Sequence, residues 1–158
     1  MGCFSQFLDQ NIFMMKRFLC VLAVAVGAIG CTPTVNYKTE RDEVMKFHDV
    51  VMQDHGVLVD NQMKLDSMLK DLPALKKKFP GLDTAKEKVV IQSTLESLVK
   101  AEELMNDWMH KFEPDITGKS NEDASVYFKT ERKKIGTIDS LYKARIKSSN
   151  AYLANYHK

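Results

Sequence analysis

The segment MKFHDVVMQDH, residues 45–55, carries the side chains of this chain best suited to bind a metal. On an α-helix, Met45, His48, Met52 and His55 fall three, four and three residues apart, so their side chains share one face. Thioether sulfur and imidazole nitrogen are ligands for Cu(I) and for haem iron. The segment therefore indicates either a copper or haem site, or the packed side of a structural helix.

Helix geometry limits which of these residues could share one ion. His48 and His55 are two turns apart, about 10.5 Å along the axis, so a single-ion set must be local. It would be Met45, His48 and Met52, or Met52 with His55. The chain has nine methionines, and methionine commonly fills gaps in helical cores, so packing is the competing interpretation. Asp49 follows His48 but points about 100° away, so we expect no His–Asp pair.

Haem binding would place His48 or His55 opposite Met105 or Met109 of a second helix, an arrangement that resembles the soluble four-helix cytochromes. The CxxCH attachment motif is absent from the sequence. The sequence also has no repeated Glu-x-x-His motif, no glycine-rich phosphate loop and no Gly-x-Ser-x-Gly. We therefore expect a protein that is not an enzyme, with no cofactor unless copper or haem occupies the Met/His face.

Residues 1–31 have the features of an upstream extension followed by a secretory signal peptide. Lys16 and Arg17 precede an unbroken apolar run of 13 residues, 18–30, which is short for a bilayer span of about 20 residues. Translation is expected to start at Met14 or Met15 rather than at Met1.

The end of this leader resembles a lipobox: Ala28, Ile29 and Gly30 precede Cys31, with Ala28 in place of the commoner leucine. In bacterial lipoproteins this motif implies diacylation of the cysteine and cleavage just before it. Cys3 and Cys20 would leave with the leader and Cys31 would carry the lipid, so no cysteine pair remains for a disulfide.

The remaining chain is expected to divide into a polar tether, residues 32–38, and a helical domain, residues 39–158. Thr32 follows the lipidated cysteine, where aspartate is associated with inner-membrane retention in some bacteria. We therefore expect a lipid-anchored protein of the cell envelope, on the outer membrane and facing the periplasm, with an envelope protein as its partner. The net charge of +2 gives no sign of a nucleic-acid partner.

Seven-residue apolar repeats predict an all-α fold, an elongated antiparallel three-helix up-down-up bundle with a coiled-coil-like seam. The helices are expected from about Thr39 to Leu72, from a capping box of Thr84 and Glu87 to just before Pro114, and from a capping box of Ser120 and Asp123 to about Tyr156. The repeats consist of Val44, Val51, Leu58, Leu65 and Leu72, then Ile91, Leu98, Met105 and Phe112, then Phe128, Ile135 and Tyr142.

The seam is interrupted by polar residues, and loop lengths give their expected register. His55 should lie level with Glu102, and Glu131 should lie opposite Glu102 on the third helix. A carboxylate that accepts the imidazole N–H offsets the cost of burying both groups. We therefore expect a buried polar layer of His55, Glu102 and Glu131 that fixes the register of the helices.

The segments 43–52 (EVMKFHDVVM), 106–112 (NDWMHKF) and 131–135 (ERKKI) resemble a group of small Bacteroidota lipoproteins. Some of these carry the label "viral A-type inclusion protein", a label that coiled-coil-like composition attracts. The resemblance implies a helical, lipid-anchored envelope protein and brings no activity or ligand with it.

Overall fold

The computed structural model describes residues 36–156, and every regular element in that range is a helix. The predictions for the signal peptide, the lipobox and Cys31 lie outside the described residues. Four helices follow one another: α2 (Tyr37–Lys70), α3 (Leu72–Lys78), α4 (Thr84–Lys111) and α5 (Asn121–Ala154). None of these helices is both long and apolar enough to cross a membrane. The all-helical prediction is confirmed for residues 36–156, where the structure has four helices and we expected three.

The additional helix is α3, in the segment 72–81 that was expected to be a connection with room for a short helical turn. Asp71 ends α2 and also caps α3, because its side chain accepts a hydrogen bond from the Ala74 N–H at 3.0 Å. Pro73 lies in the first turn of α3, where its missing N–H costs nothing. The chain therefore turns at Asp71, and α2 ends before Leu72.

The ends of the long helices show which capping predictions hold. Helix α2 begins two residues before the expected start, with Asn36 accepting from the Lys38 N–H, so the expected tether 32–38 overlaps the helix. The cap of α4 is Asp83, which accepts from the N–H groups of Ala85 and Lys86, and the prediction of Thr84 is wrong. At α5 the Ser120 cap is confirmed.

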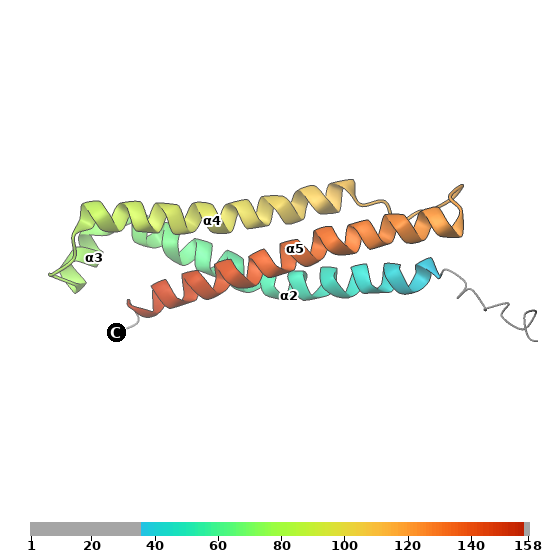
Figure 1. The fold of residues 1–158 in the computed structure, drawn as a ribbon. Coiled ribbons are helices and arrows are strands. Elements are labelled where there is room, and N and C mark those ends of the chain that lie inside the picture. The colour runs from blue at the N-terminus through green and yellow to red at the C-terminus, as the bar shows by residue number, and fades with distance from the viewer. Residues whose placement is uncertain (1–35, 157–158) are drawn as a thin grey trace, which may run out of the picture. The chain divides into compact units, whose positions relative to one another are not determined.

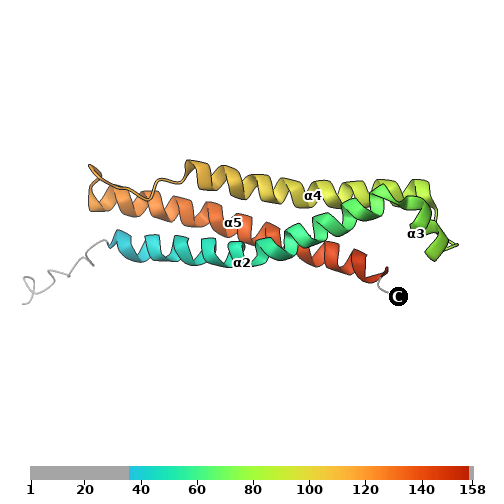
Figure 2. The same cartoon turned by 180° about the vertical axis from the view of Figure 1, so that it is seen from behind.

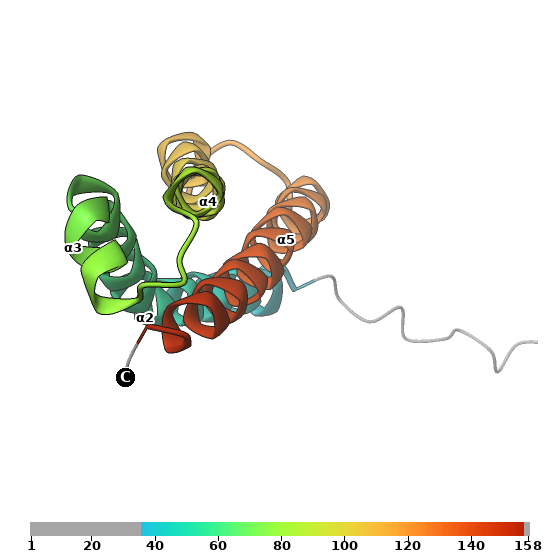
Figure 3. The same ribbon diagram turned by 90° about the vertical axis from the view of Figure 1, so that its left-hand side faces the viewer.

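The long helices pack through the residues of the predicted seven-residue repeats. In α2 and α5 every member of the repeats is fully buried, whereas Leu72, the last member of the first repeat, lies in α3 and is half-buried. In α4 the repeat is buried as far as Met105, and Phe112 is half-buried at the end of the helix. Figures 1 and 2 show α2, α4 and α5 lying alongside one another, with α3 at the end where α2 leads into α4. Viewed from that end in Figure 3, α5 crosses α2 at an angle.

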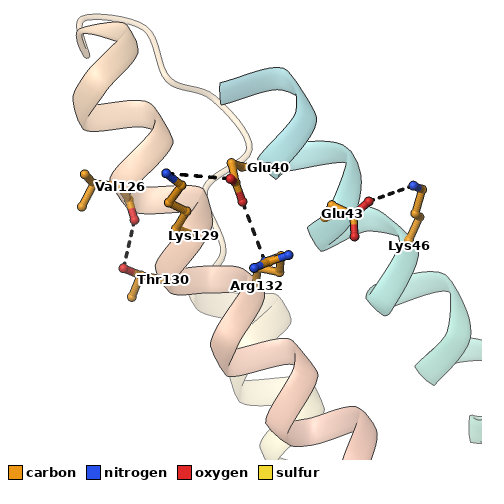
Figure 4. A network of polar contacts seen from close by, with 7 residues as sticks. All are labelled: Glu40, Glu43, Lys46, Val126, Lys129, Thr130 and Arg132. Atoms are coloured by element: carbon orange, nitrogen blue, oxygen red, sulfur yellow. Dashed lines mark hydrogen bonds and ion pairs between the residues drawn. The ribbon is translucent and has the colours of Figure 1, made fainter. Parts of the chain in front are cut away.

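Charged pairs fasten the beginning of α2 to α5. Glu40 lies 3.9 Å from Lys129 Nζ and 3.8 Å from Arg132 Nε, and Glu43 pairs with Lys46 within α2 at 2.9 Å (Figure 4). Pairs this exposed and this long stabilise the fold weakly. The packed repeats therefore supply most of the stability of the bundle.

Candidate functional site

The Met/His face of α2 lies at the border between the core and the surface. Met45 and Met52 are 38% and 39% exposed, whereas the side chains of His48 and His55 are 27% and 31% exposed. The methionines therefore do not fill the core, and the imidazoles point toward α4. The structure thus separates the four residues into an outer row of sulfur atoms and an inner row of rings.

The inner row contacts α4 at two levels. The His48 ring lies 6.3 Å from the Trp108 ring, measured between centroids. Its Nδ1 lies 3.1 Å from Asp49 Oδ1, so the expectation that these neighbours would not pair is wrong. The two side chains bend toward each other although their Cα–Cβ bonds diverge. This contact leaves His48 Nε2 as the ring nitrogen free of Asp49.

His55 approaches Glu102 as the register predicted, but the pair is half-buried rather than buried. His55 Nε2 lies 3.9 Å from Glu102 Oε1, and Gln62 Nε2 donates to Glu102 Oε2 at 2.9 Å. Tyr142 of α5 is fully buried nearby, and its hydroxyl has no hydrogen-bond partner. Burial raises the pKa of Tyr142 to about 12, and the negative charge of Glu102 contributes. The layer around Glu102 therefore consists of His55, Gln62 and Tyr142.

Glu131 does not join this layer, so the predicted set of His55, Glu102 and Glu131 is corrected. Glu131 is 4% exposed, accepts from Trp108 Nε1 at 2.8 Å and pairs with Lys134 at 2.7 Å. It therefore faces position 108 of α4 rather than position 102. The loop 112–120 is the reason: the Glu113 N–H donates to the Tyr127 hydroxyl, so the loop runs along α5 before that helix begins to pair with α4.

A second buried polar contact was missed by the sequence analysis. Asn61 is 2% exposed, and its Nδ2 donates to Ser149 Oγ at 2.8 Å and to Asn150 Oδ1 at 2.7 Å. Asn61 lies outside the seven-residue repeat of Val51, Leu58 and Leu65, so that repeat did not predict its burial. Asparagine inside a run of apolar repeats is a known register device, so this signal could have been found.

Tyrosine hydroxyls gather at the far end of α5. Tyr152 and Tyr156 both donate to Glu87 Oε1 of α4. The predicted capping box does not form, because α4 is capped by Asp83 and Glu87 is therefore one residue too far along the helix. Burial, followed by donation to Glu87, raises the pKa of both phenols. Nearby, α2, α3 and α5 border an open hollow of about 440 Å³ with Met68, Leu75, Phe79 and Leu153 in its lining. At this end of the bundle, two tyrosine–glutamate hydrogen bonds therefore join α4 to the end of the chain, beside an apolar depression in the surface.

The fit of a metal to the Met/His face depends on the donor atoms. Within residues 36–156, no three or more His, Cys, Asp or Glu side chains converge as metal ligands would. Met45, His48 and Met52 remain a local soft set that suits Cu(I), with His48 Nε2 as the nitrogen donor. His55 is engaged with Glu102 and lies outside that set.

Haem does not fit the same face. Trp108 is 6% exposed, stacks on Phe112 with ring centroids 4.8 Å apart, and lies against His48. The indole therefore fills the space between helices that a porphyrin beside His48 would need. Of the two methionines that the prediction placed opposite the histidines, Met105 is buried in the core and Met109 is 37% exposed. Comparisons with protein-family models, with curated proteins and with solved structures found no match.

Proposed function

We propose that this chain is a lipid-anchored lipoprotein of the cell envelope whose helical domain has a structural or protein-binding role and no catalytic activity. In this proposal Cys31 carries the lipid after cleavage behind Gly30, and the long helices α2, α4 and α5 form one up-down-up bundle on the outer membrane, facing the periplasm. The partner is a protein rather than nucleic acid.

The observation that carries the protein-binding role is the exposed methionine row of α2. Met45, Met52 and Met63 are 38%, 39% and 61% exposed on a helix whose other outward positions are mostly polar. These three side chains lie on one face of α2, and methionine adapts to the shape of a partner. The anchoring part of the proposal depends on the motif at residues 28–31.

Replacing Cys31 with Ser tests the anchor. We expect the native chain in the membrane fraction of a lipoprotein-processing host and the variant in the soluble fraction. Cys20→Ser is the matched control, because Cys20 lies within the apolar run and should not affect lipidation. A Cys31→Ser variant that remains membrane-bound would contradict the proposal.

Copper binding by Met45, His48 and Met52 is the second candidate, favoured by the free Nε2 of His48 beside two exposed thioethers. Copper would supply a soft, redox-active cation on the surface of α2. Titration of untagged protein with Cu(I) under anaerobic conditions tests this candidate. One equivalent bound by the native chain and none by His48→Ala would support copper; equal binding by both would exclude this set.

A further inference from the structure

The hollow beside α3 has the size and the lining of a small-molecule site. Such sites enclose about 300–1,000 Å³ and are lined mainly by apolar side chains, with a few polar groups that orient the ligand. The hollow encloses about 440 Å³ between α2, α3 and the end of α5, which Figures 1 and 3 show at the same end of the bundle as α3. Most of its lining is apolar or aromatic and includes Met68, Leu75, Phe79 and Leu153. We call it the α3 hollow.

The apolar floor of the α3 hollow is held by contacts within the chain. The Phe79 ring lies edge-on to the Tyr156 ring, with 5.2 Å between centroids. Tyr156 is held in turn by the hydrogen bond from its hydroxyl to Glu87 of α4. Leu153 is 5% exposed, and Met68 of α2 is half-buried. The floor therefore exists before any ligand arrives, as is usual for small-molecule sites.

One cation at the rim of the α3 hollow has no partner within the described part of the chain. Asp71, the carboxylate of the lining, caps α3, and Lys64 pairs with Asp60 within α2. Lys78 Nζ lies 5.6 Å from the centroid of the Phe79 ring. No carboxylate of the described residues forms an ion pair with Lys78. An ammonium group is therefore available beside the apolar floor.

Positive charge also accumulates around this end of the bundle. Residues 64–88, which include α3, contain seven lysines and four acidic residues. Residues 140–156 of α5 contain three basic residues and no acidic one, whereas residues 36–63 contain three basic and six acidic residues. Charge of one sign gathered around an opening raises the local concentration of ligands of the opposite sign. The α3 end therefore favours an anion.

We propose that the α3 hollow binds a fatty acid, a single alkyl chain that ends in one carboxylate. The alkyl chain lies on the apolar floor, and the carboxylate accepts a hydrogen bond from Lys78 Nζ. A hollow of about 440 Å³ has room for one alkyl chain but not for the two chains of a membrane phospholipid. One available cation at the rim favours one carboxylate over an acidic protein segment, which would bring several charges. This site does not depend on the proposed lipid anchor.

Titration with decanoate, followed by NMR of ¹³C-labelled methionine methyl groups, tests the site. The native chain is studied in phosphatidylcholine nanodiscs, or in buffer if it carries no lipid, so the result is separate from that of the anchor test. We expect the Met68 methyl signal, assigned with Met68→Leu, to shift and saturate. The signals of Met45 and Met63, which are exposed and do not line the hollow, should stay in place.

A cationic amphiphile separates charge recognition from apolar contact. Decyltrimethylammonium has an alkyl chain of the same length, and we expect it to bind at least about tenfold more weakly than decanoate because it lacks the carboxylate. Equal affinities of the two amphiphiles, or a Met68 signal that does not move with decanoate, would overturn the proposal. Shifts of Met45 and Met63 as large as that of Met68 would also overturn it, because they would show unspecific partitioning.

Two variants test the rim and the floor. Lys78→Gln should weaken decanoate binding by about tenfold, the loss expected for one charge-assisted hydrogen bond, whereas Lys77→Gln outside the lining should change it little. Ala74→Leu fills the α3 hollow from an exposed helical position and should abolish binding without unfolding the bundle. Undiminished binding in either Lys78→Gln or Ala74→Leu would overturn the proposal. A polyglutamate peptide that shifts Met68 where decanoate does not would assign this end to an acidic protein instead.

Discussion

Replacing Tyr142 with Phe should stabilise the bundle, which is unusual for a substitution in a helical core. The Tyr142 hydroxyl is fully buried and makes no hydrogen bond. Burying an unpaired polar group costs about 1–3 kcal/mol. Removing the oxygen leaves a void of ~15 Å³, which costs roughly 0.4 kcal/mol at ~24 cal/mol per Å³. The expected net gain in the free energy of unfolding is about 1 kcal/mol, or roughly 3–5 °C in melting temperature.

The assay is urea unfolding followed by circular dichroism, with Tyr127→Phe as the matched control. The Tyr127 hydroxyl accepts the Glu113 N–H at 2.8 Å, so its loss should cost about 0.5–1.5 kcal/mol. The two Tyr→Phe variants therefore should shift stability in opposite directions. If Tyr142→Phe destabilises the protein as much as Tyr127→Phe does, the reasoning is refuted, because the Tyr142 hydroxyl must then have a partner.

Three further predictions concern the polar groups of the core. Because burial raises the pKa of Tyr142 from 10 to about 12, the folded state holds this proton more tightly than the unfolded state. The free energy of unfolding should therefore be unaffected by this group below pH 10. It should fall as the pH rises from 10 toward 12, by at most about 1.4 kcal/mol per pH unit. The Tyr142→Phe variant should lose less stability over the same pH range. Asn61→Ala removes both contacts to α5 and should cost about 1–3 kcal/mol in thermal unfolding, whereas the exposed Asn106→Ala should change little. Glu131→Gln keeps an acceptor for Trp108 but loses the charge that pairs with Lys134. We expect the free energy of unfolding to fall by about 1–2 kcal/mol, compared with no change for the exposed Glu103→Gln. Equal losses in the two variants would place the Glu131 carboxylate outside the core.

Apolar periodicity was sufficient to predict which faces of the long helices are buried. Val44, Val51, Leu58 and Leu65 are all fully buried, because a repeat of seven keeps one side of a long helix against its neighbours over many turns. The same rule does not depend on how the helices are connected. It is therefore the part of the fold that one sequence determines best.

The register between α4 and α5 could not be predicted, because it depends on the path of a loop. The prediction that Glu131 faces Glu102 assumed that the helices meet directly after the loop. The hydrogen bond from the Glu113 N–H to Tyr127 holds the loop along α5, which moves the partner of Glu131 to Trp108. A contact between a loop backbone and a tyrosine hydroxyl leaves no periodic signal in the sequence.

For the Met/His face of α2, the sequence predicted which side of the helix the residues share but not which of them face the core. Helical spacing correctly placed the side chains of Met45, His48, Met52 and His55 toward one side of α2. Spacing could not tell that the methionines face outward and the imidazoles inward, since that depends on how close α4 lies. The exposed thioethers direct attention from the core to the surface of α2, where the protein-binding role is proposed.

The mass of the mature chain, purified from the membranes of a lipoprotein-processing host, tests the central claim most directly. We predict a polypeptide that begins at Cys31 and carries a diacylglyceryl group on the sulfur, with no detectable product that retains Gly30. Intact-mass spectrometry with sequencing of the first peptide would measure both features at once. A membrane-derived chain that retains residues before Cys31, or that carries an unmodified Cys31, would contradict the account.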